Sequence, residues 1–174
     1  MEYFIKLPIS KNDIEKLEIG DVVFLSGEIF TARDAAHKRL VNDLSNNMSP
    51  IDLTNQTIYY VGPCPAPSNH VIGSAGPTTS ARMDKYTKKL LENGLKGMIG
   101  KGPRDNFINE AIKENKAIYF IACGGAGALL AKSIIEIEEI AYKDLGTESI
   151  KRLKICNFPA VVAVDSRGDS LFGM

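Results

Sequence analysis

The stretch LKGMIGKGPRDNFINEAIKENKAIYFIA, residues 95–122, contains a strand, a turn, a helix and a second strand in 28 residues. The apolar residues of 95–100 predict a short strand, and Lys101-Gly102-Pro103 predicts a turn. The apolar spacing of 104–114 predicts a helix, and the nearly continuous apolar run 117–122 is typical of a buried strand. Such a compact unit indicates an α/β fold.

The flanking sequence extends this pattern in both directions. Apolar runs predict strands at 22–30, 57–61, 134–142 and 150–165, and helical periodicity or glycine punctuation predicts helices at 31–45, 80–93 and 124–132. Because strands also occur in succession without an intervening helix, we expect a mixed sheet with flanking helices and not a strictly alternating Rossmann sheet. No repeat or low-complexity tract divides the chain, so we expect one domain over residues 1–174.

Composition excludes several classes of partner. The 174 residues include 21 Lys+Arg and 21 Asp+Glu, giving a formal net charge of zero. A neutral chain argues against nucleic acid or an anionic membrane as the main ligand. The N-terminus has no basic, apolar leader pattern, and no segment reaches the roughly 20 apolar residues of a membrane span. We therefore expect a cytoplasmic protein.

The three cysteines do not form a metal-binding pattern. Cys64, Cys123 and Cys156 are far apart and lack CxxC or Cys/His spacing. We therefore predict that this chain ligates no metal on its own.

Glycine-rich segments resemble nucleotide-binding loops only in part. Ala131 replaces the glycine that precedes the lysine of a P-loop, and Leu130 replaces the third glycine of a dinucleotide fingerprint. Without those glycines the backbone cannot approach a phosphate closely. Nucleotide binding is therefore a minor alternative.

Cations at the starts of predicted helices are more informative. Helix N-termini expose N–H groups and favour anions, yet Arg33, Arg82 and the pair Lys101 and Arg104 occur at three such places. These side chains either face solvent or, with the backbone donors, bind a carboxylate or phosphate. The sequence leaves both interpretations open.

The first predicted helix places two polar residues on its apolar face. Arg33 and His37 continue the stripe formed by Leu40 and Leu44. His37 is either a core histidine paired with Asp34 or an acid/base group beside a carboxylate-binding arginine. The other histidine, His70, lies in a polar loop and is expected at the surface.

The densest candidate site is the segment GSAGPTTSARMD, residues 73–84. Three hydroxyls, those of Thr78, Thr79 and Ser80, precede a helix that has Arg82 in its first turn. One hydroxyl is expected to cap the helix. The others are available to bind a substrate oxygen or, if a neighbouring group takes the proton, to act in proton transfer.

These residues resemble a known family, the iron-sulfur hydro-lyases of the class I fumarate hydratase and L-tartrate dehydratase type, in their beta subunit or C-terminal domain. The resemblance spans nearly the whole chain. Its motifs are Gly20-Asp21, TARDAAH at 31–37, YVGP at 60–63, GPTT at 76–79 with Arg82-Met83-Asp84, Gly100-Lys101-Gly102 and Gly124-Gly125-Ala126.

The resemblance implies a swivelling β/β/α domain and reversible hydration of fumarate to (S)-malate, with L-tartrate dehydration as the close alternative. It implies a [4Fe-4S] cluster ligated by a partner alpha subunit, in a hetero-oligomer such as α2β2. The residues implied to bind the small dicarboxylate substrate are Arg33, Thr79, Arg82 and Lys101. His37 and Thr78 are the implied catalytic residues, and which of them moves the proton stays open. A non-catalytic domain that binds an anion or a partner protein is the alternative of a different class.

Overall fold

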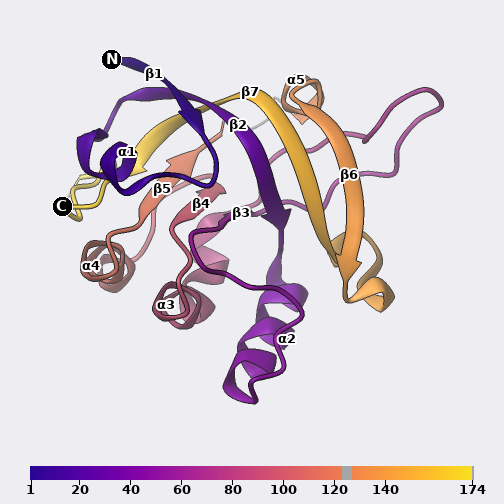
Figure 1. Cartoon of the computed structure of the whole chain (residues 1–174), viewed down its shortest axis with the longest axis horizontal. Coiled ribbons are helices and arrows are strands. Elements are labelled where there is room, and N and C mark those ends of the chain that lie inside the picture. Colours follow the sequence, from indigo (N-terminus) through magenta and orange to yellow (C-terminus); the bar gives the residue numbers. More distant parts are fainter. Residues whose placement is uncertain (123–126, 174) are drawn as a thin grey trace.

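The computed structural model describes residues 1–122 and 127–173. Seven strands form one sheet: β1 (Glu2–Lys6), β2 (Val22–Thr31), β3 (Thr57–Tyr59), β4 (Gly97–Gly100), β5 (Ile118–Ile121), β6 (Ile134–Ala141) and β7 (Ile150–Val164). The helices are α1 (Lys11–Lys16), α2 (Asp34–Ser45), α3 (Asp84–Glu92), α4 (Asn106–Glu114) and α5 (Gly127–Ala131), with 3-10 turns η1 (Ser80–Met83) and η2 (Lys143–Glu148). The predicted mixed α/β sheet with flanking helices is confirmed (Figure 1).

Two long strands organise the sheet. β2 pairs antiparallel with β7 along most of its length, while its other edge pairs parallel with β1 first and then with β3. β7 in turn pairs with β6 through its first half and with β5 through its last residues. Because β3, β4 and β5 are parallel neighbours, the pairings β2–β3–β4–β5–β7–β2 close on themselves. The sheet is therefore strongly curved (Figure 1).

The strands at the centre of the sheet are buried on both faces. Ile99 and Phe120 point into a core shared with β1, β2 and α1, whereas Met98 and Tyr119 point into a second core beneath α2, α3 and α4. Successive residues of a strand face opposite sides, so nearly every position in these short strands must be apolar. This explains the continuous apolar run at 117–122.

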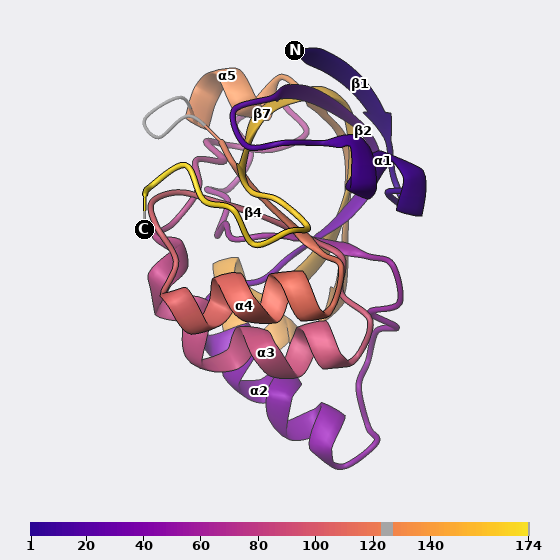
Figure 2. The same ribbon diagram turned by 90° about the vertical axis from the view of Figure 1, so that its left-hand side faces the viewer.

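Helices α2, α3 and α4 lie side by side against one face of the sheet (Figure 2). The strands β2, β3 and β4 are parallel, so their carboxyl ends lie at the same edge, close to the start of these helices. Polar residues that follow parallel strands at one edge are well placed to form a ligand site. Arg33 follows β2 by two residues, and Lys101 follows β4 directly.

The structure adds two elements at the N-terminus and moves one boundary. β1 and α1 were not predicted, although Ser10, whose hydroxyl accepts a hydrogen bond from the Asp13 amide, is an ordinary helix N-cap. The first long helix, predicted over 31–45, begins later than expected. Thr31 pairs with Tyr59 in the sheet, and α2 begins at Asp34 after Arg33. Gly124-Gly125-Ala126 and Cys123 lie outside the described residues.

Candidate functional site

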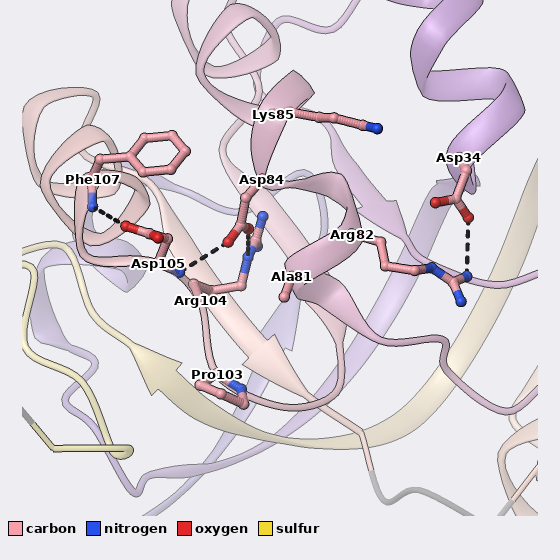
Figure 3. A pocket seen from close by; sticks show the side chains of 9 residues that line it. All are labelled: Asp34, Ala81, Arg82, Asp84, Lys85, Pro103, Arg104, Asp105 and Phe107. Atoms are coloured by element: carbon pink, nitrogen blue, oxygen red, sulfur yellow. Dashed lines mark hydrogen bonds and ion pairs between the residues drawn. The ribbon is translucent and has the colours of Figure 1, made fainter.

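The centre of the site is the contact between Arg82 and Thr78. The Nη2 atom of Arg82 donates to Thr78 Oγ1 at 2.8 Å. The same atom donates to Asp34 Oδ2 at 3.0 Å (Figure 3). One nitrogen therefore connects the loop after β3 to the start of α2. Within the described residues, Arg82 Nε and Nη1 make no hydrogen bond, and about half of the side chain is exposed. Those two donors are available to an oxyanion from solvent.

Arg33 lies beside this contact at the N-terminus of α2. Its side chain is 31% exposed, and its Nε is 4.0 Å from Glu148 Oε1. A Cβ atom on Gly62 would lie 2.7 Å from Arg33 Nη1 and 2.9 Å from Arg33 Cδ, so the arginine side chain packs directly over this glycine. An open depression of about 530 Å³ is lined by both arginines, Asp34 and Glu148.

His37 is fully buried on the inner face of the same helix, α2. Its Nδ1 is 2.9 Å from the Arg33 carbonyl oxygen, which can only accept, so Nδ1 carries the proton. Nε2 is buried without a hydrogen-bond partner among the described residues, and the ring packs against Tyr60 and Tyr86. Burial lowers the pKa of His37 from 6.5 to about 4, so the ring is neutral near pH 7. Asp34, the candidate partner of His37 in one of the two interpretations, pairs with Arg82 instead.

The three consecutive hydroxyls do not cap the following helix. Thr79 precedes η1 and makes no side-chain capping bond, and Met83 precedes α3 and makes none. Thr78 Oγ1 accepts from Arg82, whereas Ser80 Oγ accepts from the Lys101 amide at 3.0 Å. The prediction that one of these hydroxyls caps the helix is therefore wrong.

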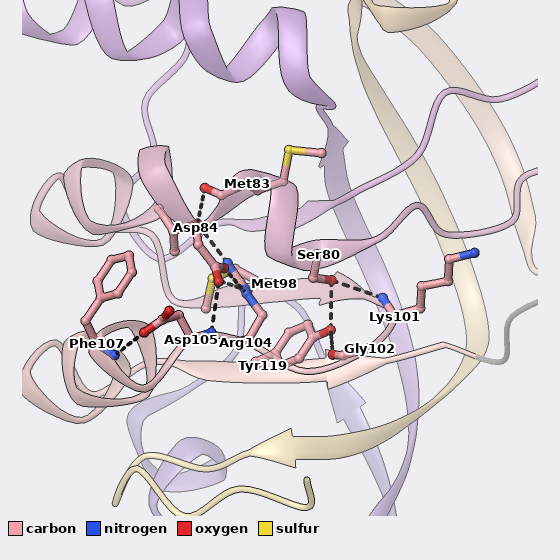
Figure 4. A network of polar contacts seen from close by, with 11 residues as sticks. Ser80, Met83, Asp84, Met98, Lys101, Gly102, Arg104, Asp105, Phe107 and Tyr119 are labelled. Atoms are coloured by element: carbon pink, nitrogen blue, oxygen red, sulfur yellow. Dashed lines mark hydrogen bonds and ion pairs between the residues drawn. The ribbon is translucent and has the colours of Figure 1, made fainter.

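Lys101 is connected to this segment through the backbone. Thr79 and Lys101 form an isolated parallel bridge, and the Ser80 amide donates to the Lys101 carbonyl at 3.0 Å. Lys101 itself is exposed, and its side chain extends away from the buried contacts below it (Figure 4). The segment that contains Thr78 and Arg82 therefore lies directly beside the segment that contains Lys101.

Arg104 differs from the other cations at helix starts because it is a core residue. Its side chain is 0% exposed, and its Nε donates to Asp84 Oδ1 at 2.6 Å (Figure 4). Nη2 donates to Thr87, and the guanidinium lies over the rings of Tyr60 and Tyr119. Arg104 connects α3 to the loop before α4 and offers nothing to a ligand.

Comparisons with known proteins identify the family of this chain. The sequence pattern of the family described as Fumarase C-terminus matches residues 3–174. The chain belongs to this family. It is 38% identical to the putative L(+)-tartrate dehydratase subunit beta of Methanocaldococcus jannaschii, over 99% of this chain and 91% of that protein. It is 32% identical to the L(+)-tartrate dehydratase subunit beta of Escherichia coli K12, over 98% of this chain and 87% of that protein.

The chain also matches part of a longer relative, which is named as a fumarate hydratase. The putative fumarate hydratase class I of Geobacillus stearothermophilus is 36% identical over 96% of this chain, which covers only 33% of that protein. The chain thus corresponds to about a third of the fumarate hydratase and to most of the tartrate dehydratase subunits.

The described part of this family member has no cluster of three or more His, Cys, Asp or Glu side chains that could hold a metal ion. Cys64 and Cys156 are both free and exposed. The donor set of residues 1–122 and 127–173 therefore does not fit an iron-sulfur cluster. None of the helices in those residues has the length and hydropathy of a membrane span.

Proposed function

We propose that this chain is the beta subunit of an iron-sulfur hydro-lyase that hydrates fumarate reversibly to (S)-malate. The observation behind the proposal is the arrangement of Thr78 beside Arg82, with Arg33 and Lys101 on the neighbouring segments. Such a set of cations and one reactive hydroxyl suits a small dicarboxylate. L-Tartrate dehydration is the second candidate, favoured by the near-complete coverage of the tartrate dehydratase beta subunits.

Arg82 is proposed to bind one substrate carboxylate. Its Nε and Nη1 donate to no described residue, so each can donate a charge-assisted hydrogen bond to a carboxylate oxygen. Asp34 and Thr78 occupy Nη2 and hold the guanidinium in one orientation. Arg33 and Lys101 are proposed to bind the second carboxylate, with Thr79 as a nearby hydroxyl donor.

Thr78 is proposed to transfer the proton at the carbon next to a substrate carboxylate. Because Arg82 donates into Oγ1, the Thr78 hydroxyl hydrogen is free to point toward the substrate or toward an accepting group. The positive guanidinium also stabilises negative charge that develops on Oγ1 as that hydrogen leaves. A neutral threonine is a poor base, so the proposal requires an activating group from the partner subunit.

His37 is proposed to support the site from within the core. It is fully buried and its Nδ1–H donates to the Arg33 carbonyl, so it fixes the backbone from which Arg33 extends. This division of roles keeps proton transfer with the half-buried Thr78 and assigns positioning to His37.

The cofactor is proposed to be a [4Fe-4S] cluster ligated by an alpha subunit. The described residues of this chain lack a ligand set for it, so the partner would have to supply all of the cluster ligands. We propose a hetero-oligomer such as α2β2 located in the cytoplasm. The residues of this chain would bind and orient the dicarboxylate and move a proton at Thr78 Oγ1.

Anaerobic co-expression with an alpha-type partner, followed by assays with malate, fumarate and L-tartrate, tests the proposal. Turnover of fumarate and malate supports it, and turnover of L-tartrate alone selects the second candidate. A cluster-loaded complex that converts none of them would indicate a non-catalytic anion-binding domain and refute the hydro-lyase assignment.

The role of Thr78 has its own test. Thr78→Val keeps the shape but removes Oγ1, and we expect kcat to fall about 10²- to 10⁴-fold. Thr78→Ser retains the hydroxyl and should keep most of the activity. Equal losses in both variants would point to packing instead of proton transfer.

A further inference from the structure

A buried hydroxyl pair lies directly beneath the proposed Lys101 site. Tyr119 of β5 is fully buried, and its hydroxyl is 2.7 Å from Ser80 Oγ and 2.8 Å from the Gly102 carbonyl oxygen (Figure 4). Ser80 Oγ is also 3.0 Å from the Lys101 amide nitrogen. These contacts join the segment that follows Thr78 to the residues on either side of Lys101.

The chemistry of the groups decides which atom donates and which accepts in each of these hydrogen bonds. The Gly102 carbonyl can only accept, so the Tyr119 proton goes to it. The Ser80 hydroxyl then donates to Tyr119 Oη and accepts from the Lys101 N–H. Every polar atom in this short path is satisfied, and a fully satisfied buried network favours a single arrangement.

The Ser80 and Tyr119 side chains are closely packed on both sides. A methyl group on Gly100 would lie 1.9 Å from Ser80 Oγ, so the serine hydroxyl fills the space above that glycine. On the other side of Tyr119, the Arg104 guanidinium lies 4.9 Å from the ring centroid. Burial also raises the pKa of Tyr119, so its hydroxyl stays protonated as a donor.

We infer that Ser80 and Tyr119 are positioning residues that hold the Lys101 ammonium at the correct place relative to Thr78 and Arg82. This inference rests on the proposed function of the site. Neither side chain reaches the exposed surface, since Ser80 and Tyr119 are both fully buried. They act on the substrate only through the backbone of residues 101–102.

The test compares two tyrosine-to-phenylalanine variants in the reconstituted complex. Tyr119→Phe removes the hydroxyl that bonds to Ser80 and Gly102. Tyr60→Phe is the matched control, because Tyr60 is equally buried and its hydroxyl has no partner among the described residues. We expect KM for the dicarboxylate to rise about tenfold in Tyr119→Phe with kcat nearly unchanged, and neither value to change in Tyr60→Phe.

A double-mutant cycle separates positioning from general destabilisation. If Tyr119 acts through Lys101, then Tyr119→Phe should have no further effect on KM in a Lys101→Ala background. Ser80→Ala removes the other hydroxyl of the pair, and it should reproduce the rise in KM. Thermal unfolding of each complex checks that the variants are folded at the assay temperature.

The outcomes distinguish the two proposals. An active wild-type complex with the same KM in the Tyr119→Phe and Tyr60→Phe variants would overturn the positioning role alone. Additive effects of Tyr119→Phe and Lys101→Ala would also overturn it. A wild-type complex that is loaded with its cluster but converts no dicarboxylate would overturn the proposed function and this inference with it.

Discussion

Arg82 and Arg104 occupy similar places in the sequence and very different places in the molecule. Each lies near the start of a helix, and each pairs with an aspartate, Asp34 at 3.0 Å and Asp84 at 2.6 Å. The Arg82 side chain is 47% exposed, whereas that of Arg104 is 0% exposed. A cation at a helix start therefore marks a candidate anion site only when its remaining donors face solvent.

The difference arises from the elements around each arginine. Arg104 Nη2 donates to Thr87 and its guanidinium covers two tyrosine rings, so it has little left to offer. Arg82 is held through one nitrogen, and its other two nitrogens donate to none of the residues that the structure describes. Arg104 holds α3 against the loop before α4, whereas Arg82 keeps donors available for an anion.

The largest expected effect is on stability, from Arg104→Ala. The substitution leaves Asp84 buried without its cation, which should lower the free energy of unfolding by about 3–5 kcal/mol. Urea unfolding measures this change. The matched control is Arg152→Ala, since the Arg152–Glu138 pair has the same 2.6 Å separation but is largely exposed, and its loss should hardly be measurable. Equal losses of unfolding free energy in Arg104→Ala and Arg152→Ala would show that burial does not make the Arg104–Asp84 pair more stabilising than the exposed pair.

Arg82→Ala should affect activity strongly and stability only weakly. We expect kcat/KM of the reconstituted complex to fall roughly 10²- to 10³-fold, because a donor set for the charged transition state is lost. The free energy of unfolding should change by less than about 1 kcal/mol, since Asp34 is 39% exposed and regains water. Arg82→Lys should recover little activity because an ammonium lacks the planar, fixed donor arrangement that lets the guanidinium contact Thr78, Asp34 and the carboxylate at once. Near-normal turnover in Arg82→Ala would remove this residue from the site.

The buried His37 predicts that the free energy of unfolding depends on pH, with an effect smaller than that of Arg104→Ala. Its pKa falls from 6.5 to about 4 on folding, so the unfolded chain takes up the proton first as the pH is lowered. The stability that His37 provides is complete above pH 6.5 and is lost toward pH 4. The loss should reach about 2 kcal/mol between pH 7 and pH 5.

A non-titrating variant checks that assignment. His37→Asn keeps an amide that can donate to the Arg33 carbonyl, as Asn93 does to the Lys89 carbonyl. Its unfolding free energy should vary less over this pH range than that of the wild type. An unchanged slope would assign the pH dependence to other groups. The carboxyls of Asp13 and Asp21, whose pKa values are lowered below 3.8, titrate at lower pH.

Sequence patterns predicted the local structure well and its long-range contacts poorly. Apolar periodicity located the strands and helices, and it placed His37 on the buried face of α2. It could not show that Thr31 belongs to β2, since that depends on pairing with Tyr59. The partners of Arg82 and Arg104 also depend on topology, because Asp34 is 48 residues from Arg82.

The same limit applies to the residues beneath the site. Tyr119 appears in the sequence as one more apolar strand residue, and Ser80 as one of three hydroxyls before a helix. Only the parallel pairing of β4 with β5 brings Tyr119 beneath Lys101. The sequence thus predicted which segment carries the candidate site but not which buried groups lie beneath it.

The smallest expected effect concerns the acid beside Arg82. Asp34→Asn retains an oxygen that can accept from Nη2 but removes a negative charge close to the proposed carboxylate site. We expect KM for the dicarboxylate to fall about two- to fivefold at low salt and to return to the wild-type value at high salt, because exposed charges are screened. Asp144→Asn is the control, since Asp144 pairs with Arg39 and does not line the depression at Arg82. If KM instead rises and the rise persists in salt, Asp34 matters as a mechanical support for Arg82, and the guanidinium then depends on its aspartate as Arg104 does.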